Sequence, residues 1–392
     1  MKRIIFILLI ALLMLSSAPL QLIASAGSLS VDETVAPSMP DISGITAESA
    51  ILIDAKTGDV LWGKNSDNKR PIASTTKIMT ALVAIKYGNL DDTVTVNADV
   101  LGPGKQGGIG LIPGEQIKLR DLLYALLLPS ANDAAVAIAD HIGGSVENFA
   151  AMMNKEASQI GALNTHFVNP HGLDNALHYS TAHDLALITI HAMQNEVFTQ
   201  VVSTRATNIN RSNPALSLTV KNYNKLLSTY PGATGGKTGY TRGAGNCLVS
   251  TATRNGVSLI SVVLGVKNRA ALFEESARLL DFGFGLYKEK QLITRGTIFK
   301  IKSPENDRQI DLVATEDVNA VVRDALPVNV KASGVAEVAV PVKKGTIFGR
   351  VTVEQAGRII AVSNFVAKEE AKKPTLQQLT SPYSMQFKIK AS

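Results

Sequence analysis

The order of helical and strand patterns along the chain constrains its fold most. Helical patterns, which lack Pro and Gly and carry apolar residues on one or more faces, cover residues 75–85, 121–128, 134–141 and 149–160. Strand patterns lie on both sides of this helical block and cover residues 50–54, 60–62, 247–252 and 259–266. A last helix is expected over residues 270–282. This order within one continuous stretch predicts a sheet packed against helices.

The pattern changes at about Gln291. Short runs rich in Val, Ile and Thr cover residues 297–302, 309–314, 337–342, 346–353 and 359–362. The chain has 392 residues, 45% of them hydrophobic, and this length favours two domains over one. We therefore expect a first domain over residues 45–288, a small all-β domain over residues 289–370 and a tail over residues 371–392.

The N-terminus has the order of a secretory signal peptide. Lys2-Arg3 precedes an apolar run from Ile4 to Leu15, and small residues end at Ala24-Ser25-Ala26. We expect residues 1–26 to be a signal peptide and residues 27–44, which contain Pro37 and Pro40, to be a flexible lead-in. The apolar run is short for a bilayer span, although an uncleaved anchor stays open. No later segment has a transmembrane pattern.

Charge and cysteine content narrow the function classes. The formal charge is +6, falls to +4 without Lys2 and Arg3, and includes no long block of Lys or Arg, which argues against nucleic-acid binding. Cys247 is the single cysteine, so the chain has no internal disulfide. Its apolar neighbours predict a small buried side chain instead of a nucleophile.

Ser74 and Lys77 are the first candidates for chemistry. A serine hydroxyl is a weak nucleophile and needs a base within hydrogen-bond reach. Ser74-Thr75-Thr76-Lys77 opens a predicted helix, where residues three apart share a face. The helix N-terminus favours negative charge near Ser74. Lys77 must be neutral to accept a proton, and the apolar residues that follow it supply the burial that lowers the pKa of an amine.

Two short motifs of this kind, Ser-x-x-Lys and Lys-Thr-Gly, also occur at positions without an apolar helix beside them. Ser66-Asp67-Asn68-Lys69 also reads Ser-x-x-Lys, but it lies in a polar stretch that we expect to be a solvated loop. Lys56-Thr57-Gly58 lies in a predicted hairpin turn. A motif of this length is only a hypothesis until its context supports it.

Two further motifs follow Ser74 in order. Ser130-Ala131-Asn132 comes after Pro129 between two apolar helices, a position that projects two polar side chains from a buried layer into a cleft. Lys237-Thr238-Gly239 follows a Gly-rich run and precedes a strand pattern. Glycine at such a place lets the backbone approach a ligand closely.

The ordered triple Ser-x-x-Lys, Ser-x-Asn and Lys-Thr-Gly resembles the penicillin-recognising serine enzymes. Within these, residues 73–80, 129–134 and 230–241 resemble the low-molecular-mass penicillin-binding proteins that are serine-type D-alanyl-D-alanine carboxypeptidases. The similarity covers about residues 45–370. It implies an α/β (α+β) β-lactamase/transpeptidase-like domain, with an antiparallel sheet flanked by helices, followed by a small all-β C-terminal domain.

The resemblance implies catalytic roles for Ser74, Lys77 and Ser130. Ser74 would attack the carbonyl between the terminal D-alanines of a peptidoglycan stem peptide, Lys77 would take its proton, and Ser130 would relay a proton to the leaving amine. Backbone N–H groups of Ser74 and Tyr240 would form the oxyanion hole, where one donor is often worth ~3 kcal/mol. Water would accept the acyl group, no cofactor or metal is implied, and β-lactam antibiotics would act as inhibitors.

The resemblance also implies a substrate-binding set. Asn132 would hold the substrate amide, and Lys237 with Thr238 would bind the terminal carboxylate beside Gly239 and the strand that follows. The charge of Lys237 would keep the lysine base neutral. Relatives place an arginine beyond the next strand near the carboxylate, and Arg269 is the candidate here, although its spacing differs.

A zinc peptidase is the main alternative by residue type. Four histidines fall in one region, at positions His166, His171, His178 and His183. No His-Glu-x-x-His motif occurs, and the surrounding sequence favours turns and a helix start. We therefore expect no metal site.

Two other functions share the expected fold. A class A β-lactamase needs a glutamate in a Glu-x-x-Leu-Asn pattern, but Leu163-Asn164 is the only Leu-Asn pair and Ile160 stands at the glutamate position. A catalytically silent wall-binding protein is the second alternative, and the complete motifs argue against it.

We expect the mature protein in the cell envelope, outside the cytoplasm, either associated with the membrane or secreted. Relatives often end in an amphipathic helix that docks on the membrane. Here Pro374, Pro382 and a period-two apolar pattern argue against such a helix. Lys388 and Lys390 leave contact with anionic lipid at the outer face of the cytoplasmic membrane open.

Overall fold

The computed structural model describes residues 41–100, 102, 106–302, 309–334, 343–369 and 388–389. The expected signal peptide, residues 27–40 of the lead-in, and the tail except for residues 388–389 lie outside these ranges. The chain divides into two compact units. Of the described residues, one unit takes residues 41–288 and 323–325, and the other takes residues 289–322 and those from 326 onward.

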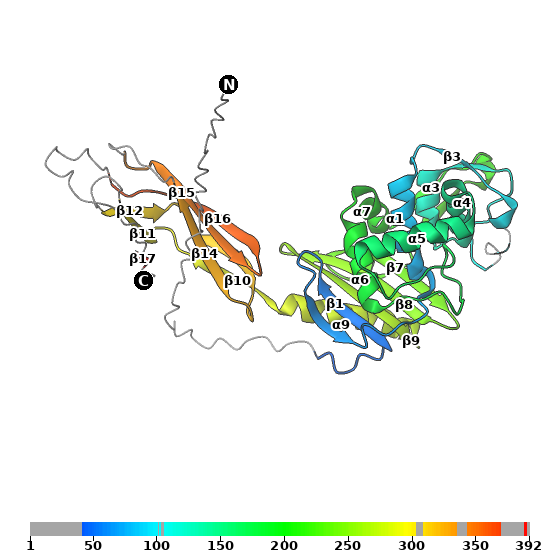
Figure 1. Ribbon diagram of the computed structural model, residues 1–392, viewed down its shortest axis with the longest axis horizontal. Coiled ribbons are helices and arrows are strands. Elements are labelled where there is room, and N and C mark those ends of the chain that lie inside the picture. The colour runs from blue at the N-terminus through cyan, green and yellow to red at the C-terminus, as the bar shows by residue number, and fades with distance from the viewer. Residues whose placement is uncertain are drawn as a thin grey trace, which may run out of the picture. The chain divides into compact units, whose positions relative to one another are not determined.

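The first unit contains a five-stranded antiparallel sheet in the order β2-β1-β9-β8-β7 (Figure 1). Its strands are β1 Ser49–Asp54, β2 Val60–Lys64, β7 Ala233–Thr241, β8 Gly245–Arg254 and β9 Val257–Val266. The first hairpin, β1 and β2, joins the later strands through the pairing of β1 with β9. The predicted sheet, formed from segments on both sides of a helical block, is confirmed, and β7 lies at one edge.

Helix α9, Arg269–Gly285, covers one face of the sheet, and α6, Ala182–Met193, packs on the same strands (Figure 1). Helix α9 packs closely against the leucine side chains of the sheet at Gly283. A Cβ added to Gly283 would come within 2.6 Å of Leu259 Cδ1 and 2.7 Å of Leu52 Cδ2. The central strands are buried on both sides, which explains their unbroken apolar sequences.

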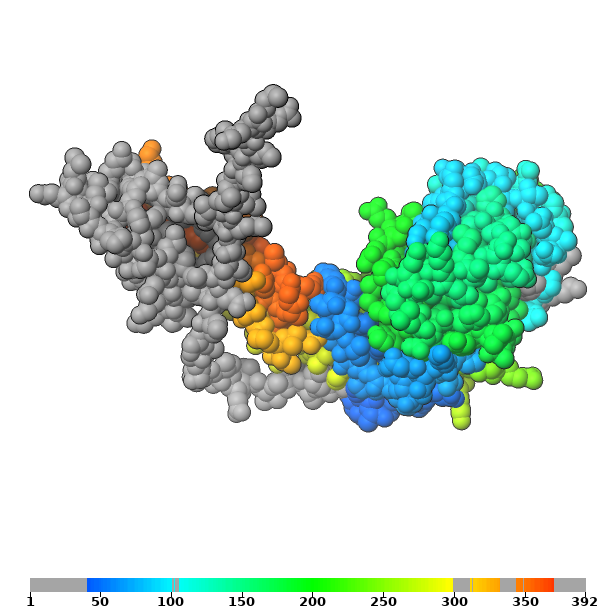
Figure 2. All heavy atoms as spheres, viewed as in Figure 1, coloured from blue at the N-terminus to red at the C-terminus, as the bar shows by residue number. Residues whose placement is uncertain are grey.

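The helical block packs around α1, whose residues from Lys77 to Ala84 are all buried. Its helices are α1 Lys77–Tyr87, α3 Leu119–Leu127, α4 Asn132–Gly143, α5 Val146–Ile160, α7 Glu196–Ser203 and α8 Leu226–Thr229. Short 3-10 turns are η1 Ala73–Thr76, η2 Ala98–Val100 and η3 Pro214–Leu216. Two small hairpins pair β3 Thr93–Thr95 with β4 Gln116–Lys118 and β5 Ala206–Ile209 with β6 Leu218–Lys221. In Figure 2 this block, coloured cyan to green, forms one continuous surface.

The second unit is built from strands, as predicted. Its strands are β10 Tyr287–Ile293, β11 Ile298–Lys302, β12 Gln309–Ala314, β13 Val318–Arg323, β14 Val328–Gly334, β15 Ile347–Gln355, β16 Arg358–Ala367 and β17 Lys388–Ile389. Six of them form a sheet in the order β14-β15-β16-β12-β11-β17, and β10 pairs with β13. Val351, Val353 and Phe365 lie in its small core. The strand expected over residues 337–342 lies outside the described residues.

In the part of the chain that the structure describes, no helix has the length and apolar character needed to cross a membrane.

Candidate active site

Ser74 and Lys77 lie at the junction of η1 and α1. Ser74 is the second residue of η1, and Lys77 is the first residue of α1. The distance from Lys77 Nζ to Ser74 Oγ is 2.8 Å. Ala73, directly before Ser74, has a φ of +48°, in a region that non-glycine residues rarely adopt. Such backbone strain is often found at functional sites.

The side chain of Lys77 is fully buried among oxygen atoms. Besides the Ser74 hydroxyl, Lys77 Nζ donates to Asn132 Oδ1 at 2.6 Å and to the backbone oxygen of His171 at 2.8 Å. Burial lowers the pKa of Lys77 well below its usual value, and the charge of Lys237 lowers it further. The carboxylate of Asp133 acts in the opposite direction.

Ser130 and Asn132 lie where α3 is followed by α4. Ser130 is half-buried and has a φ of +67°, which turns the chain sharply before Asn132 begins α4. The Asn132 N–H donates to Gly107 O at 2.7 Å, and Asn132 Nδ2 donates to Gln106 O at 3.3 Å. These bonds orient Asn132 Oδ1 toward Lys77.

Strand β7 brings Lys237, Thr238 and Gly239 to the same site. A Cβ added to Gly239 would lie 2.8 Å from Ser74 N, so only glycine allows the strand to pass this close. Lys237 is buried, and its Nζ donates to Thr238 O at 2.9 Å. Burial lowers the pKa of Lys237 to about 7. Tyr240, the next residue along β7 after Gly239, has 66% of its surface exposed.

The predicted residues differ in how directly the structure connects them to Ser74. Ser74, Lys77 and Asn132 are joined by hydrogen bonds. Gly239 packs against the backbone of Ser74, and the charge of Lys237 acts on Lys77. Thr238 and Tyr240 flank Gly239 on β7, and Ser130 lies two residues before Asn132. Arg269 is the first residue of α9 and is exposed.

The loop that contains His171 was missed by the sequence analysis. His171 O accepts from Lys77 Nζ and, at 3.4 Å, from Ser74 Oγ. Gly172 has a φ of +86°, and a Cβ on it would lie 1.9 Å from Ala73 O. Asn169 Oδ1 accepts from the Gly172 N–H at 2.7 Å and fixes this turn. The turn-like sequence was the available signal, but a backbone carbonyl has no signature in a sequence.

One ring nitrogen of His171 has a partner within the protein. Its Nδ1 accepts from the Leu173 N–H at 3.1 Å. Burial, with the charges of Lys77 and His178, lowers the pKa of His171 to about 3. His178 Nε2 lies 2.8 Å from Thr76 Oγ1, also within the protein. Among the residues that the structure describes, no cluster of His, Cys, Asp and Glu forms a metal site.

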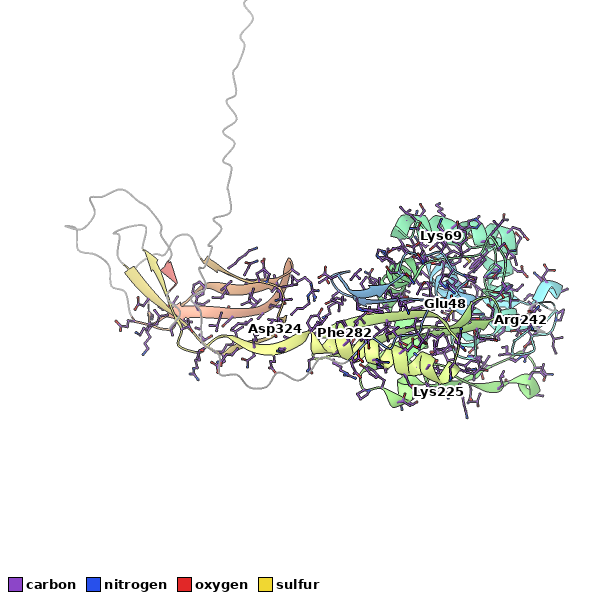
Figure 3. All side chains as sticks on the ribbon, turned by 90° about the horizontal axis from the view of Figure 1, so that it is seen from below. Glu48, Lys69, Lys225, Arg242, Phe282 and Asp324 are labelled. Atoms are coloured by element: carbon purple, nitrogen blue, oxygen red, sulfur yellow. The ribbon has the colours of Figure 1, made fainter. Side chains whose placement is uncertain are left out.

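The two duplicate motifs lie elsewhere. Ser66 Oγ donates to Asp67 Oδ2 at 2.8 Å, and Lys69 Nζ lies 5.0 Å from the centre of the Tyr179 ring (Lys69 is labelled in Figure 3). Lys56 Nζ donates to Gly256 O at 2.7 Å. None of these contacts involves the Ser74 site.

Cys247 is buried in β8, as expected. Burial raises the pKa of its thiol to about 12, so the thiol stays protonated at neutral pH. Cys247 therefore packs as a small apolar side chain.

The fold and site define a serine hydrolase with the penicillin-binding, transpeptidase-like fold. A family model described as D-alanyl-D-alanine carboxypeptidase matches residues 33–268. A second, described as the C-terminal domain of penicillin-binding protein 5, matches residues 287–373. The chain belongs to the D-alanyl-D-alanine carboxypeptidase family, a family of serine-type hydrolases.

Individual relatives agree with this assignment. D-alanyl-D-alanine carboxypeptidase DacF of Bacillus subtilis is 32% identical over 95% of this chain and 95% of its own length. DacC of Escherichia coli is 34% identical over 83% of this chain and 84% of its own length. The solved D-alanyl-D-alanine carboxypeptidase from Mycobacterium tuberculosis H37Rv has 35% identity and a TM-score of 0.59, and the match covers 65% of this chain and 96% of that one.

Proposed function

We propose that this chain removes the terminal D-alanine from peptidoglycan stem peptides through an acyl-enzyme on Ser74. Lys77 is the base, Ser130 relays a proton, and Asn132, Lys237, Thr238, Gly239 and Tyr240 bind the substrate. The catalytic domain is proposed to span residues 45–288 and the β-rich domain residues 289–370.

The observation that carries this proposal is the arrangement of partners around Lys77 Nζ. A neutral amine has two N–H donors and one lone pair. Asn132 Oδ1 at 2.6 Å and His171 O at 2.8 Å are both acceptors and use the two N–H groups. The charged amine donates its third N–H to Ser74 Oγ at 2.8 Å, and in the neutral amine the lone pair faces this oxygen in its place. Because burial and Lys237 favour the neutral amine, Lys77 is suited to take the hydroxyl proton.

Acylation forms a bond between Ser74 Oγ and the carbonyl carbon of the penultimate D-alanine while Lys77 takes the Oγ proton. The N–H groups of Ser74 and Tyr240 stabilise the oxyanion. The C–N bond then breaks, and the leaving D-alanine amine receives a proton through Ser130. In deacylation, water attacks the same carbon while Lys77 takes one of its protons, the bond to Ser74 Oγ breaks, and that proton passes to Ser74 Oγ.

The terminal carboxylate is proposed to bind at Lys237 and Thr238. The free Lys237 amine has a pKa of about 7 because it is buried. An incoming carboxylate favours its charged form, since opposite charges at close range stabilise each other. Substrate binding therefore favours the charged form of Lys237.

The test is an intact-mass measurement of the protein after incubation with penicillin, combined with an assay of D-alanine release from a D-Ala-D-Ala peptide. We expect a stoichiometric adduct on Ser74 and release of D-alanine, both lost in Ser74→Ala. Ser66→Ala is the matched control, because Ser66 has the same motif outside the site, and it should keep both activities. Rapid turnover of penicillin without a lasting adduct would instead indicate a β-lactamase. An adduct that survives Ser74→Ala would overturn the mechanism.

We further propose that the protein acts outside the cytoplasm after cleavage of residues 1–26, in the cell envelope or in contact with the outer face of the cytoplasmic membrane. The order of Lys2-Arg3, apolar run and Ala24-Ser25-Ala26 supports export. N-terminal sequencing of the exported protein should begin at Gly27, and membrane fractionation will separate tethered from released forms.

A further inference from the structure

We propose that Arg242, together with the exposed Tyr240, forms a subsite for a carboxylate on the acyl side of the substrate, one or two residues before the D-alanine that carries the reacting carbonyl. This inference rests on the proposed function and adds a substrate preference to it. It follows from how the turn between β7 and β8 is held, from the direction of β7, and from the charge of Arg242.

The turn that carries Arg242 is fixed on both sides of this residue. Asp174 Oδ1 accepts from Thr241 Oγ1 at 2.6 Å, and Asp174 Oδ2 accepts from the Gly243 N–H at 3.0 Å. Thr241 Oγ1 also accepts from the Ala244 N–H at 3.0 Å. One carboxylate thus holds the residues before and after Arg242. The backbone of Arg242 is preorganised, which lowers the entropy cost of binding through its side chain.

The guanidinium of Arg242 is available for a ligand. Arg242 is exposed, and Figure 3 shows its label at the end of the first unit's sheet. Within the described ranges, Arg242 has no ion pair, and the nearby Asp174 carboxylate accepts from Thr241 and Gly243 instead. An arginine fork matches a carboxylate with two parallel hydrogen bonds. A carboxylate is therefore the ligand that suits this position.

The direction of β7 places this carboxylate on the acyl side. Along the strand, Lys237 and Thr238 come first, Gly239 packs against Ser74 N, and Tyr240 follows; Arg242 lies in the turn directly after the strand. With the terminal carboxylate at Lys237, the part of the peptide that precedes the scissile bond runs past Tyr240 toward Arg242. Two residues of strand span about 7 Å, which corresponds to one or two peptide residues beyond the reacting carbonyl. The exposed Tyr240 ring offers an apolar surface on this path.

The experiment compares two peptides, acetyl-Glu-Leu-D-Ala-D-Ala and acetyl-Gln-Leu-D-Ala-D-Ala, and repeats the comparison with acetyl-Leu-Glu-D-Ala-D-Ala and acetyl-Leu-Gln-D-Ala-D-Ala. In one of the two pairs the native enzyme should prefer the acidic peptide about three- to tenfold in kcat/KM, mainly through KM, as expected for an exposed charge-assisted pair. The preference should shrink at high salt. Arg242→Gln should abolish it, and Arg242→Lys should keep part of it.

The controls separate this inference from folding and from the proposed function. Lys155→Gln removes one exposed positive charge on α5 and should leave the preference unchanged. An unchanged rate of penicillin acylation in Arg242→Gln will show an intact site. Equal kcat/KM for the acidic and neutral peptides in both pairs, or a preference that survives Arg242→Gln, would overturn the inference while the proposed function stands. Release of D-alanine from no peptide would overturn the proposed function and the subsite with it.

Discussion

Lys77 and Lys237 are two buried lysines of one site, and the positive charge of Lys237 lowers the pKa of Lys77. Two ammonium groups are costly to bury together, so the site favours a state in which one amine is neutral. Burial lowers the pKa of both amines, to about 7 for Lys237, and the charge of Lys237 lowers the pKa of Lys77 further. In the proposed mechanism Lys77 is therefore the neutral amine, and Lys237 is the cation that meets a carboxylate.

Replacing Lys237 by alanine should move the acid limb of the pH–rate profile, in which the rate of penicillin acylation rises with pH, to higher pH. A base acts when it is neutral, so the rate rises as the pH passes the Lys77 pKa. Loss of the Lys237 charge raises that pKa, and the rate below the limb should fall about tenfold for each pH unit that the limb moves. Stopped-flow acylation between pH 5 and pH 9 will measure the limb. Lys155→Ala, an exposed lysine on α5, should leave it in place, and a limb that is unmoved or moves to lower pH in Lys237→Ala would contradict the assignment.

The pKa of Lys237, about 7, predicts how peptide binding depends on pH. Because the proposed function has the charged amine bind the terminal carboxylate, KM should be nearly constant below pH 7 and should rise by up to tenfold per pH unit above it. The measurement is KM for a D-Ala-D-Ala peptide across this range. A peptide with an amidated C-terminus lacks the carboxylate and should not show this rise. A KM that is flat through pH 9 for the free acid would place the carboxylate elsewhere.

The sequence predicted the sheet, its helical block and the second β-rich unit because these depend on periodicity. Runs such as β9 and helix α1 are apolar enough to identify locally. Helix α7 and the hairpin of β5 and β6 were not predicted, because their short segments have weak patterns. Strand β7 was also missed. Gly235 and Gly236 have φ values of +148° and +123°, and added Cβ atoms would lie 2.5 Å from Val202 Cγ2 and 2.0 Å from Val249 O, so close packing and not β propensity decides its sequence.

The candidate site was predictable only in part for a related reason. Ser74, Lys77, Asn132 and Lys237 belong to motifs whose side chains carry chemistry. His171 contributes a backbone oxygen, which any residue has, and Asp174 acts from a turn distant in sequence from β7. Such contacts depend on the tertiary fold and leave no local pattern.

Gly239→Ala should disable acylation without unfolding the protein. The added Cβ would lie 2.8 Å from Ser74 N and 3.0 Å from Ala73 Cβ, so β7 must move away from the nucleophile. A displacement near 1 Å at a reacting centre costs on the order of 100-fold in rate. Penicillin acylation will measure the loss, and circular dichroism will check folding. Gly63→Ala is the control on strand β2, because its added Cβ meets only ordinary contacts at 3.6 Å. Equal acylation by the two variants would show that Ser74 tolerates movement of β7.

Removing one partner of the ion pair between Arg211 and Glu115 should be strongly destabilising because the pair is buried. Two hydrogen bonds of 2.5 Å join the side chains, which are 3% and 4% exposed. Arg211 also donates to Ile109 O at 3.2 Å and Gly110 O at 2.8 Å. Arg211→Met leaves a buried carboxylate without its partner and should cost about 3–5 kcal/mol in the free energy of unfolding, measured with denaturant.

The exposed pair of Arg120 and Asp91, at 3.0 Å and with side chains 56% and 78% exposed, is the matched control for this prediction. Arg120→Met should cost less than about 1 kcal/mol, because water screens the pair. Joint replacement of Arg211 and Glu115 by Met and Leu should recover much of the loss, since no buried charge then remains unpaired. If Arg211→Met costs no more than Arg120→Met, burial of the pair does not govern its contribution, and the segment with Ile109 and Gly110 is held by its other contacts.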